Sequence, residues 1–201
     1  MEIYLARHGE TEYNKTRRIM GQMMVPINET GREQAKKLAV ALKDKGITAI
    51  HSSDLTRAIE TSEIIGAELG LTFEAYEELR EHGVGKLEGV TWALEYENMT
   101  LEEFDELMVK EDGELTDIFV VRVWKIFLEI IEKHEKDDKI LILSHGGCIR
   151  VILMKILRST LDIFSILQLG NCCINKIIYD EEAKNYKFKV DLVNDMSHLK
   201  I

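Results

Sequence analysis

Short apolar runs alternate with longer segments of helical periodicity along the chain. Ile3–Ala6 and Lys139–Leu143 are continuous apolar runs, which is the pattern of strands buried on both faces of a sheet. Similar short runs predict strands at Ile47–His51, Thr72–Tyr76, Ile174–Tyr179 and Tyr186–Leu192. The last two flank the turn-like segment 182–185 and are expected to pair antiparallel.

Between these runs the apolar positions follow the helical period. A helix is expected after Asn28 or Thr30, which can cap its start, and Gly46 ends it. Ser53 or Asp54 is expected to cap the next helix, which Gly70 closes, and two further helices are predicted at Thr116–Lys133 and Cys148–Leu157. This alternation of strands and helices predicts a three-layer α/β/α sandwich with a mostly parallel central sheet.

One segment departs from the alternation. Gly83–Gly113 is less regular and contains an acidic helical piece at Leu101–Lys110. We interpret residues 83–115 as a small helical lid inserted into a single domain that covers residues 1–201.

Composition and charge argue against several kinds of binding partner and cellular location. The chain has 201 residues, is 45% hydrophobic and carries a formal net charge of -10, which argues against nucleic acid and anionic membranes as partners. Cys148, Cys172 and Cys173 are an odd number with two adjacent, which favours free thiols in a reducing cytoplasm. Charges at Arg122, Lys125, Lys155 and Arg158 interrupt the most apolar stretches, so no membrane span is expected. The first residues do not resemble a signal peptide, so secretion is not expected either.

Two of the predicted strands are followed by a histidine and glycine. Arg7–Gly9 follows the first strand, and Ser144–Gly147 follows the strand at Lys139–Leu143. In parallel α/β sheets the ligand crevice lies at the carboxyl ends of the strands, and glycine permits tight turns there. A single strand-end histidine is more often structural, but two in matching contexts, one beside an arginine, indicate a site.

A third strand adds a cation at the same edge. Arg57 lies in the first turn of the helix that follows Ile47–His51. The amino end of a helix presents free N–H groups and a positive dipole end, which favour a phosphate group. An arginine on a helix is usually an ordinary surface residue, so the edge that it shares with His8 is what favours a phosphate site.

These motifs resemble the histidine phosphatase superfamily, also called phosphoglycerate-mutase-like, over nearly the whole chain. The similar blocks are RHGET at Arg7–Thr11 with Asn14 after it, SSDLTRAIET with Arg57, LREHGVGKLEG with Glu81, SHGGCIR with His145, and the tail motifs NCCIN and VNDMSHL. The presence of both the RHGET block and the SHGGCIR block is far more specific for this superfamily than either block alone.

The resemblance implies that His8 is a nucleophile. A neutral imidazole can attack phosphorus and form a phosphohistidine, if the proton sits on the other ring nitrogen and a backbone carbonyl near Gly9 holds it there. Arg7 and Arg57 are expected to bind the phosphoryl oxygens as forked donors, and His145 and Asn14 to complete the pocket.

The resemblance also implies a proton donor and a binding loop. Glu81 is the expected general acid, which then acts as the base that activates water. From the residues alone, a solvated carboxylate is the preferred interpretation of Glu81. Gly21, Gln22 and Gly146 are expected to contribute to phosphate or substrate binding.

No metal and no other cofactor is expected. A metal site built from His8, His82 and His145 is conceivable, but Arg7 beside His8 disfavours a second cation. The chain has no C-x5-R, phosphate-loop or HExxH motif. The expected partner is a small phosphorylated metabolite, while the oligomeric state, monomer or homodimer, is left open.

Two details favour the phosphatase branch over mutase chemistry. Mutases of this family usually read ERHYG at the acid block, where this chain has Glu81–Gly85. Between Gly89 and Ser144 no two Lys or Arg residues are adjacent, so a second phosphate has little to hold it. A metal-independent phosphomonoesterase is predicted. The alternatives are a cofactor-dependent phosphoglycerate mutase and an alpha-ribazole-phosphate phosphatase of cobalamin synthesis.

Four apolar residues bear on substrate size. Met23, Met24, Val84 and Leu87 either line an apolar substrate pocket or pack within the core and loops. The first alternative would suit a bulky phosphomonoester.

Overall fold

The computed structural model describes residues 1–91 and 99–200. Its strands form one sheet in the order β3-β2-β4-β1-β5-β6. Their bounds are β1 (Glu2–Arg7), β2 (Ala49–Ser53), β3 (Phe73–Tyr76), β4 (Lys139–Ser144), β5 (Ile174–Tyr179) and β6 (Phe188–Asp195). The first four pair in parallel, and β5 and β6 add antiparallel at one edge. The predicted mostly parallel sheet and the antiparallel tail pair are confirmed.

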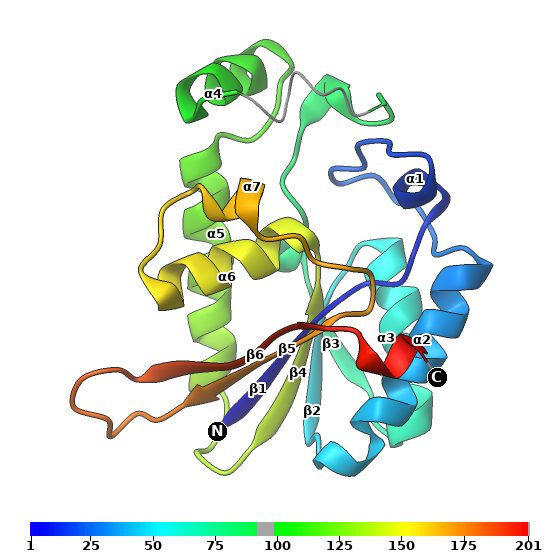
Figure 1. The fold of residues 1–201 in the computed structure, drawn as a ribbon, viewed down its shortest axis with the longest axis vertical. Coiled ribbons are helices and arrows are strands. Elements are labelled where there is room, and N and C mark those ends of the chain that lie inside the picture. Colours follow the sequence, from blue (N-terminus) through cyan, green and yellow to red (C-terminus); the bar gives the residue numbers. More distant parts are fainter. Residues whose placement is uncertain (92–98, 201) are drawn as a thin grey trace.

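Helices cover both faces of this sheet, with α2 and α3 on one side and α5 and α6 on the other (Figure 1). The bounds are α1 (Glu12–Lys15), α2 (Glu29–Leu42), α3 (Thr56–Leu69), α4 (Leu101–Lys110), α5 (Thr116–Glu132), α6 (Gly146–Leu157) and α7 (Ile163–Ile166). Short 3-10 helices cover Lys43–Lys45, Glu77–Leu79, Gly85–Leu87 and Ser197–Lys200. None of the described helices is long and apolar enough to cross a membrane.

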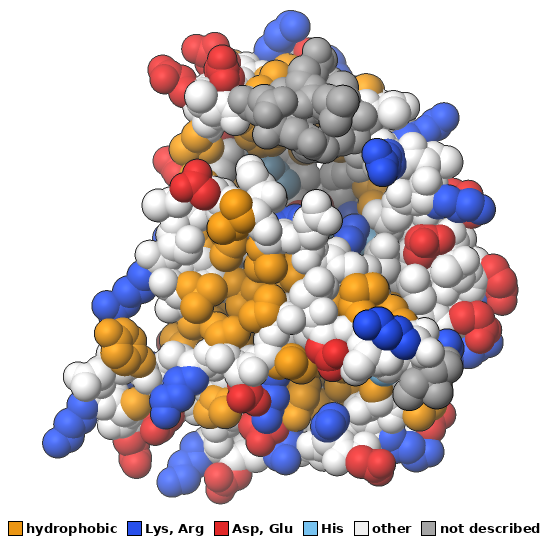
Figure 2. All heavy atoms as spheres, in the orientation of Figure 1, with side chains coloured by type: hydrophobic (Ala, Val, Ile, Leu, Met, Phe, Trp, Pro, Cys, Tyr) orange, Lys and Arg blue, Asp and Glu red, His pale blue; other side chains and the backbone are white. Residues whose placement is uncertain are grey.

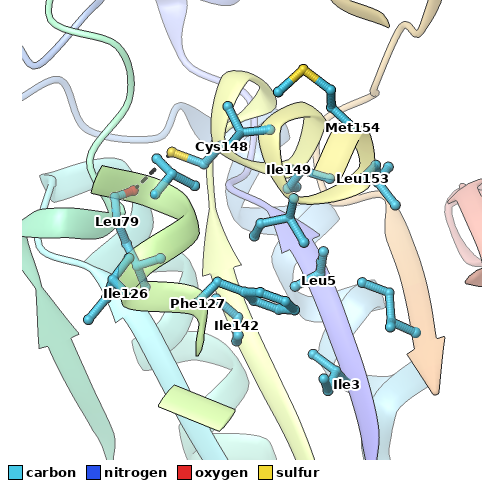
Figure 3. Packing of buried hydrophobic residues seen from close by; sticks show 14 of the residues in the cluster. Ile3, Leu5, Leu79, Ile126, Phe127, Ile142, Cys148, Ile149, Leu153 and Met154 are labelled. Carbon is cyan, nitrogen blue, oxygen red and sulfur yellow. Dashed lines mark hydrogen bonds between the residues drawn. The ribbon is translucent and has the colours of Figure 1, made fainter. Parts of the chain in front are cut away.

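Alternation along β1 explains its continuous apolar sequence. Ile3 and Leu5 belong to the core beneath α5 and α6, whereas Tyr4 and Ala6 belong to the core beneath α2 and α3. Figure 3 shows Ile3 and Leu5 close to Phe127, one of the fully buried side chains of α5. Because both faces of the strand are covered, its buried central residues, Ile3–Ala6, form a continuous apolar run.

The cysteines belong to these cores. All three are buried free thiols. The thiol of Cys148 donates to the carbonyl oxygen of Leu79 at 3.4 Å, the dashed line in Figure 3. Burial raises the pKa of the Cys148 thiol above its usual range. A neutral thiol in this position acts as a small apolar side chain with one weak donor.

One of the two candidate caps of α2 is confirmed, whereas α2 ends at Leu42 and a 3-10 helix, Lys43–Lys45, continues the chain to Gly46. Asn28 Oδ1 accepts a hydrogen bond from Gly31 N at 2.8 Å. Gly46 and Gly70 adopt left-handed conformations, with φ of 74° and 68°, where the chain leaves the 3-10 helix after α2 and where it leaves α3. A glycine suits these positions because a Cβ atom disfavours positive φ.

Several predicted boundaries are wrong, among them those of β2, which runs from Ala49 to Ser53 and not from Ile47 to His51. The amino cap of α3 is Leu55, without a side-chain cap, because Arg80 binds the carboxylate of Asp54 at 2.7 and 2.6 Å and Ser53 contacts His145. α6 begins at Gly146, two residues before its predicted start. β6 begins and ends later than predicted, and its pairing with β5 is irregular.

The segment interpreted as a lid is described in part, since residues 92–98 lie outside the described residues. Its described helix, α4, lies at the end of the molecule farthest from the N-terminus (Figure 1). Val84 and Leu87 pack with Met108 of α4 in a small cluster separate from the two main cores. This part of the chain therefore has its own apolar core.

The loop after β1 is packed closely against the start of α2. A Cβ atom on Gly9 would lie 2.6 Å from the carbonyl oxygen of Gly31, and one on Gly31 would lie 2.2 Å from that of Glu10. Asn28 N also donates to Glu10 O at 2.8 Å. Main-chain atoms on both sides leave no room for a side chain, so the loop position is fixed by this contact.

We predict that Gly31→Ala destabilises the protein although alanine is the better helix former. The added methyl group must displace the main chain at Glu10, which is expected to lower the free energy of unfolding by about 1–3 kcal/mol. Thr30→Ala, at the exposed neighbouring position, is the control and should change it by less than about 0.5 kcal/mol. Urea denaturation of both variants measures this, and equal stabilities would contradict the close contact.

Candidate active site

Two neighbouring strands place two histidines at the same edge of the sheet. Arg7 pairs with Ser144 in the parallel register of β1 and β4. The next residue along each strand is a histidine, and the ring centroids of His8 and His145 are 5.2 Å apart. Both side chains are buried. Figure 2 shows histidine atoms in pale blue and Lys or Arg atoms in blue within a recess in the upper half of the molecule.

The main chain holds His8 in one tautomer. Nδ1 lies 2.7 Å from the carbonyl oxygen of Gly9. Because a carbonyl oxygen only accepts, Nδ1 carries the proton and Nε2 keeps its lone pair. Burial, followed by the positive charges of Arg57 and Arg7, holds the pKa of His8 well below its usual value. The imidazole is therefore neutral at about pH 7.

Arg57 is a fully buried cation held by main-chain oxygens. Its Nη1 donates to Met23 O at 2.9 Å and its Nη2 to Gly21 O at 2.8 Å, while its Nε donates to His145 Nδ1 at 3.2 Å. Burial lowers the pKa of Arg57 to about 10, which still leaves it charged at about pH 7. Gly21, expected as a phosphate ligand, thus contacts Arg57 through its carbonyl group.

His145 has a defined tautomer as well. Its Nδ1 accepts from Arg57, so Nε2 carries the proton and donates to Ser53 Oγ at 2.8 Å. Burial, then Arg57, holds the pKa of His145 well below its usual value. From the sequence, Ser53 is expected only as a candidate helix cap. Its position at the end of β2, on the edge that carries both histidines, is the signal that could have identified this contact.

Arg7 lies beside both histidines. Its Nη1 donates to the carbonyl oxygen of Leu169 at 2.5 Å. Its Nε is buried and has no hydrogen-bond partner among the described residues. Burial lowers the pKa of Arg7, and the nearby Glu81 carboxylate opposes that effect. A buried N–H without a partner is costly, and an anion bound at this site would satisfy it.

Glu81 is fixed at the start of α6. Its carboxylate accepts from Gly147 N and from His82 N, each at 3.0 Å. Gln22 Nε2 donates to the main-chain carbonyl of Glu81 at 3.1 Å. A Cβ atom on Gly147 would lie 2.1 Å from Glu81 Oε1. The absence of a side chain at Gly147 therefore leaves room for the Glu81 carboxylate at the start of α6. Gln22 holds the main chain of Glu81 through its hydrogen bond.

Asn14 and a residue missed from the sequence complete the edge. Asn171 Nδ2 donates to His8 O at 3.0 Å and to Asn14 Oδ1 at 3.1 Å. Thr11 N donates to the same Asn14 oxygen at 3.2 Å, so the Nδ2 hydrogens are the donors that Asn14 can offer a ligand. Asn171 lies in the NCCIN motif, which the sequence analysis noted without assigning a role.

The side chains of two groups of residues considered from the sequence contact other parts of the chain than the two histidines. Val84 and Leu87 are buried in the small cluster with Met108, which favours packing over a substrate-lining role, and Met24 is mostly exposed. The ring of His82 stacks on Phe119, and its Nε2 contacts Glu114 O. Among residues 1–91 and 99–200, no group of three His, Cys, Asp or Glu side chains is placed to hold a metal ion.

The fold and this edge define an α/β protein with a cationic, anion-binding site beside a neutral histidine. The sequence model of the histidine phosphatase superfamily (branch 1) matches residues 3–194. The chain therefore belongs to this superfamily, as predicted. The protein is a phosphatase that uses a histidine nucleophile.

Relatives over nearly the full length carry both kinds of name found in the family. The chain is 33% identical over 207 residues to a metal-independent phosphoserine phosphatase of Arabidopsis thaliana, which covers 98% of this chain and 83% of that protein. It is 32% identical over 207 residues to phosphoglycerate mutase-like protein 4 of Arabidopsis thaliana, at 98% and 86% coverage. The solved structure of Bacillus stearothermophilus YhfR matches with a TM-score of 0.85 at 29% identity, over 98% of each chain.

The burial of neutral His8 predicts a pH-dependent stability. Below about pH 6.5 the unfolded chain gains a proton on this residue that the folded protein excludes. The free energy of unfolding should therefore fall as the pH decreases from about 6.5 to 5, approaching about 1.4 kcal/mol per pH unit for this group. His8→Asn removes the titration, so its slope should be shallower by that amount. Urea unfolding in phosphate-free buffer measures both slopes, and equal slopes would contradict a depressed pKa.

Proposed function

We propose that this protein hydrolyses small phosphomonoesters without a metal ion, through a phosphohistidine at Nε2 of His8. The orientation of this ring carries the proposal. The Gly9 carbonyl holds the proton at Nδ1, so the lone pair of Nε2 is available beside two buried guanidinium groups. A neutral nucleophile next to fixed positive charge suits attack on an anionic phosphate ester.

The phosphoryl group would bind where Arg7, Arg57 and His8 meet. The unpartnered Nε of Arg7 supplies one donor. Arg57 is already held in place through main-chain contacts, so little reorganisation is needed when the oxygens arrive. Asn14 adds an amide donor, and His145, hydrogen-bonded to Arg57, fixes the orientation of that guanidinium group. The first turn of α6, at Gly146, adds a positive dipole end.

Glu81 is the proposed general acid and base. In the first step Nε2 of His8 bonds to phosphorus, the ester P–O bond breaks, and Glu81 gives its proton to the leaving oxygen. In the second step the carboxylate removes a proton from water, the water oxygen bonds to phosphorus and the N–P bond breaks. The two N–H donors from Gly147 and His82 keep the carboxylate in position for both steps.

We assign the substrate to small phosphorylated metabolites and the protein to the cytoplasm. The name of the phosphoserine phosphatase relative supports the first assignment. Three buried free thiols support the second, because such thiols persist in a reducing compartment.

We predict that His8→Ala lowers the rate of para-nitrophenyl phosphate hydrolysis by more than about a thousandfold, because the nucleophile is lost. Activity of the unchanged protein should be the same with and without a chelator. Rapid quenching in an alkaline denaturant should trap an acid-labile phosphoenzyme in the unchanged protein and none in the variant.

His134→Gln, which alters a histidine that contacts His51 instead of His8, is the matched control and should retain activity. Loss of activity on chelation, or retained activity in His8→Ala, would overturn the mechanism. With phosphoglycerate as substrate, turnover to the isomeric phosphoglycerate that depends on added bisphosphoglycerate would identify a mutase instead.

We predict that Glu81→Gln separates the two steps. With para-nitrophenyl phosphate, whose leaving group needs no proton, the variant should release about one equivalent of nitrophenol rapidly and then turn over slowly. With an alkyl phosphate the first step should also slow, by about a hundredfold or more. Glu78→Gln, an exposed change nearby, should behave like the unchanged protein. An equal loss on both substrates without a burst would contradict the assigned role.

A further inference from the structure

A third arginine lies beside the phosphoryl site. Arg150 is on α6, one helical turn after Gly146, and its guanidinium group folds back over that turn. A Cβ atom placed on Gly146 would lie 3.2 Å from Arg150 Nη1 and 3.7 Å from Arg7 Nε. The two guanidinium groups therefore both lie against the same glycine, and a Cβ atom at Gly146 would be closest to that of Arg150.

Both arginines are tethered to one segment of main chain. Arg150 Nε donates to the carbonyl oxygen of Leu167 at 2.7 Å, and Arg7 Nη1 donates to that of Leu169 at 2.5 Å. One nitrogen of each fork is thereby used to fix its position. For Arg150 no hydrogen bond from Nη1 or Nη2 occurs within residues 1–91 and 99–200, so these two donors remain for a ligand.

Arg150 is a partly buried cation without a carboxylate partner. In the described part of the chain no Asp or Glu oxygen lies within 4.0 Å of it, whereas Arg80 and Arg122 both form ion pairs. Burial lowers the pKa of Arg150, and the Glu81 carboxylate opposes that effect. A phosphate dianion can offset Arg7 and Arg57, which leaves the charge of Arg150 unbalanced.

We propose that Arg150 binds a carboxylate group of the substrate, and so selects phosphomonoesters that carry a carboxylate near the ester oxygen. This inference rests on the proposed phosphatase function of the same site. One guanidinium fork with two free donors matches one carboxylate, and a second phosphate would call for more than one cation. A substrate without the carboxylate leaves Arg150 unpaired, and that difference produces selectivity.

Phosphoserine and phosphoethanolamine provide the test, because they differ only in the carboxylate. The unchanged protein should prefer phosphoserine by about tenfold to a hundredfold in kcat/KM, as expected for a charge-assisted hydrogen bond. Arg150→Gln should remove most of this preference by raising KM for phosphoserine, while kcat/KM for phosphoethanolamine changes less than about threefold. Arg150→Lys, which keeps the charge, should retain part of the preference.

Lys155→Gln, an exposed change of the same charge on the same helix, is the control and should leave the preference intact. Equal losses on both substrates in Arg150→Gln would overturn the proposal and make Arg150 an anchor for Leu167. If that variant does not fold, an equal kcat/KM for the two substrates in the unchanged protein would overturn it as well. In either case hydrolysis of para-nitrophenyl phosphate would leave the proposed function standing, whereas its absence would remove both.

Discussion

The parallel pairing of β1 with β4 is the constraint on which the site depends. It sets Arg7 opposite Ser144, so the residues that follow bring His8 and His145 to adjacent positions. If the pairing register changed by one residue, the side chains of the shifted strand would point to the opposite faces of the sheet. They would then exchange places between the two apolar clusters. Because both faces of β1 are buried, the register is strongly determined, and the geometry of the histidines follows from core packing.

Main-chain oxygens stabilise the buried positive charge at this edge. Arg57 donates to the carbonyls of Gly21 and Met23, and Arg7 to that of Leu169. Carbonyl dipoles hold a guanidinium group in place without neutralising it, whereas a carboxylate partner would compete with a phosphate. The same positive charge, together with burial, keeps His8 neutral. The binding of an anion and the presence of an unprotonated nucleophile therefore have a common electrostatic origin.

The sequence predicted the parts of the site that follow strands and missed the parts that depend on distant contacts. His8, His145 and Arg57 were found because apolar strands end next to them. Asn171 and Ser53 were missed because their partners lie 163 and 92 residues away in the chain. The predicted cap of α3 was wrong for the same reason, since a distant arginine occupies the Asp54 carboxylate. Local patterns predict elements well, and long-range competition for polar groups decides what those groups contact.

Arg150, the residue proposed to recognise the substrate carboxylate, lies on a helix of the main core and not on α4. α6 is packed along most of its length in the core beneath it, so a guanidinium group on this helix is ordered before substrate arrives and loses little entropy on binding. The described part of the inserted segment carries an acidic helix, α4, with its own small apolar cluster. An acidic surface contributes no attraction for an anionic substrate. Selection for a carboxylate is therefore expected to come from the rigid core and not from α4.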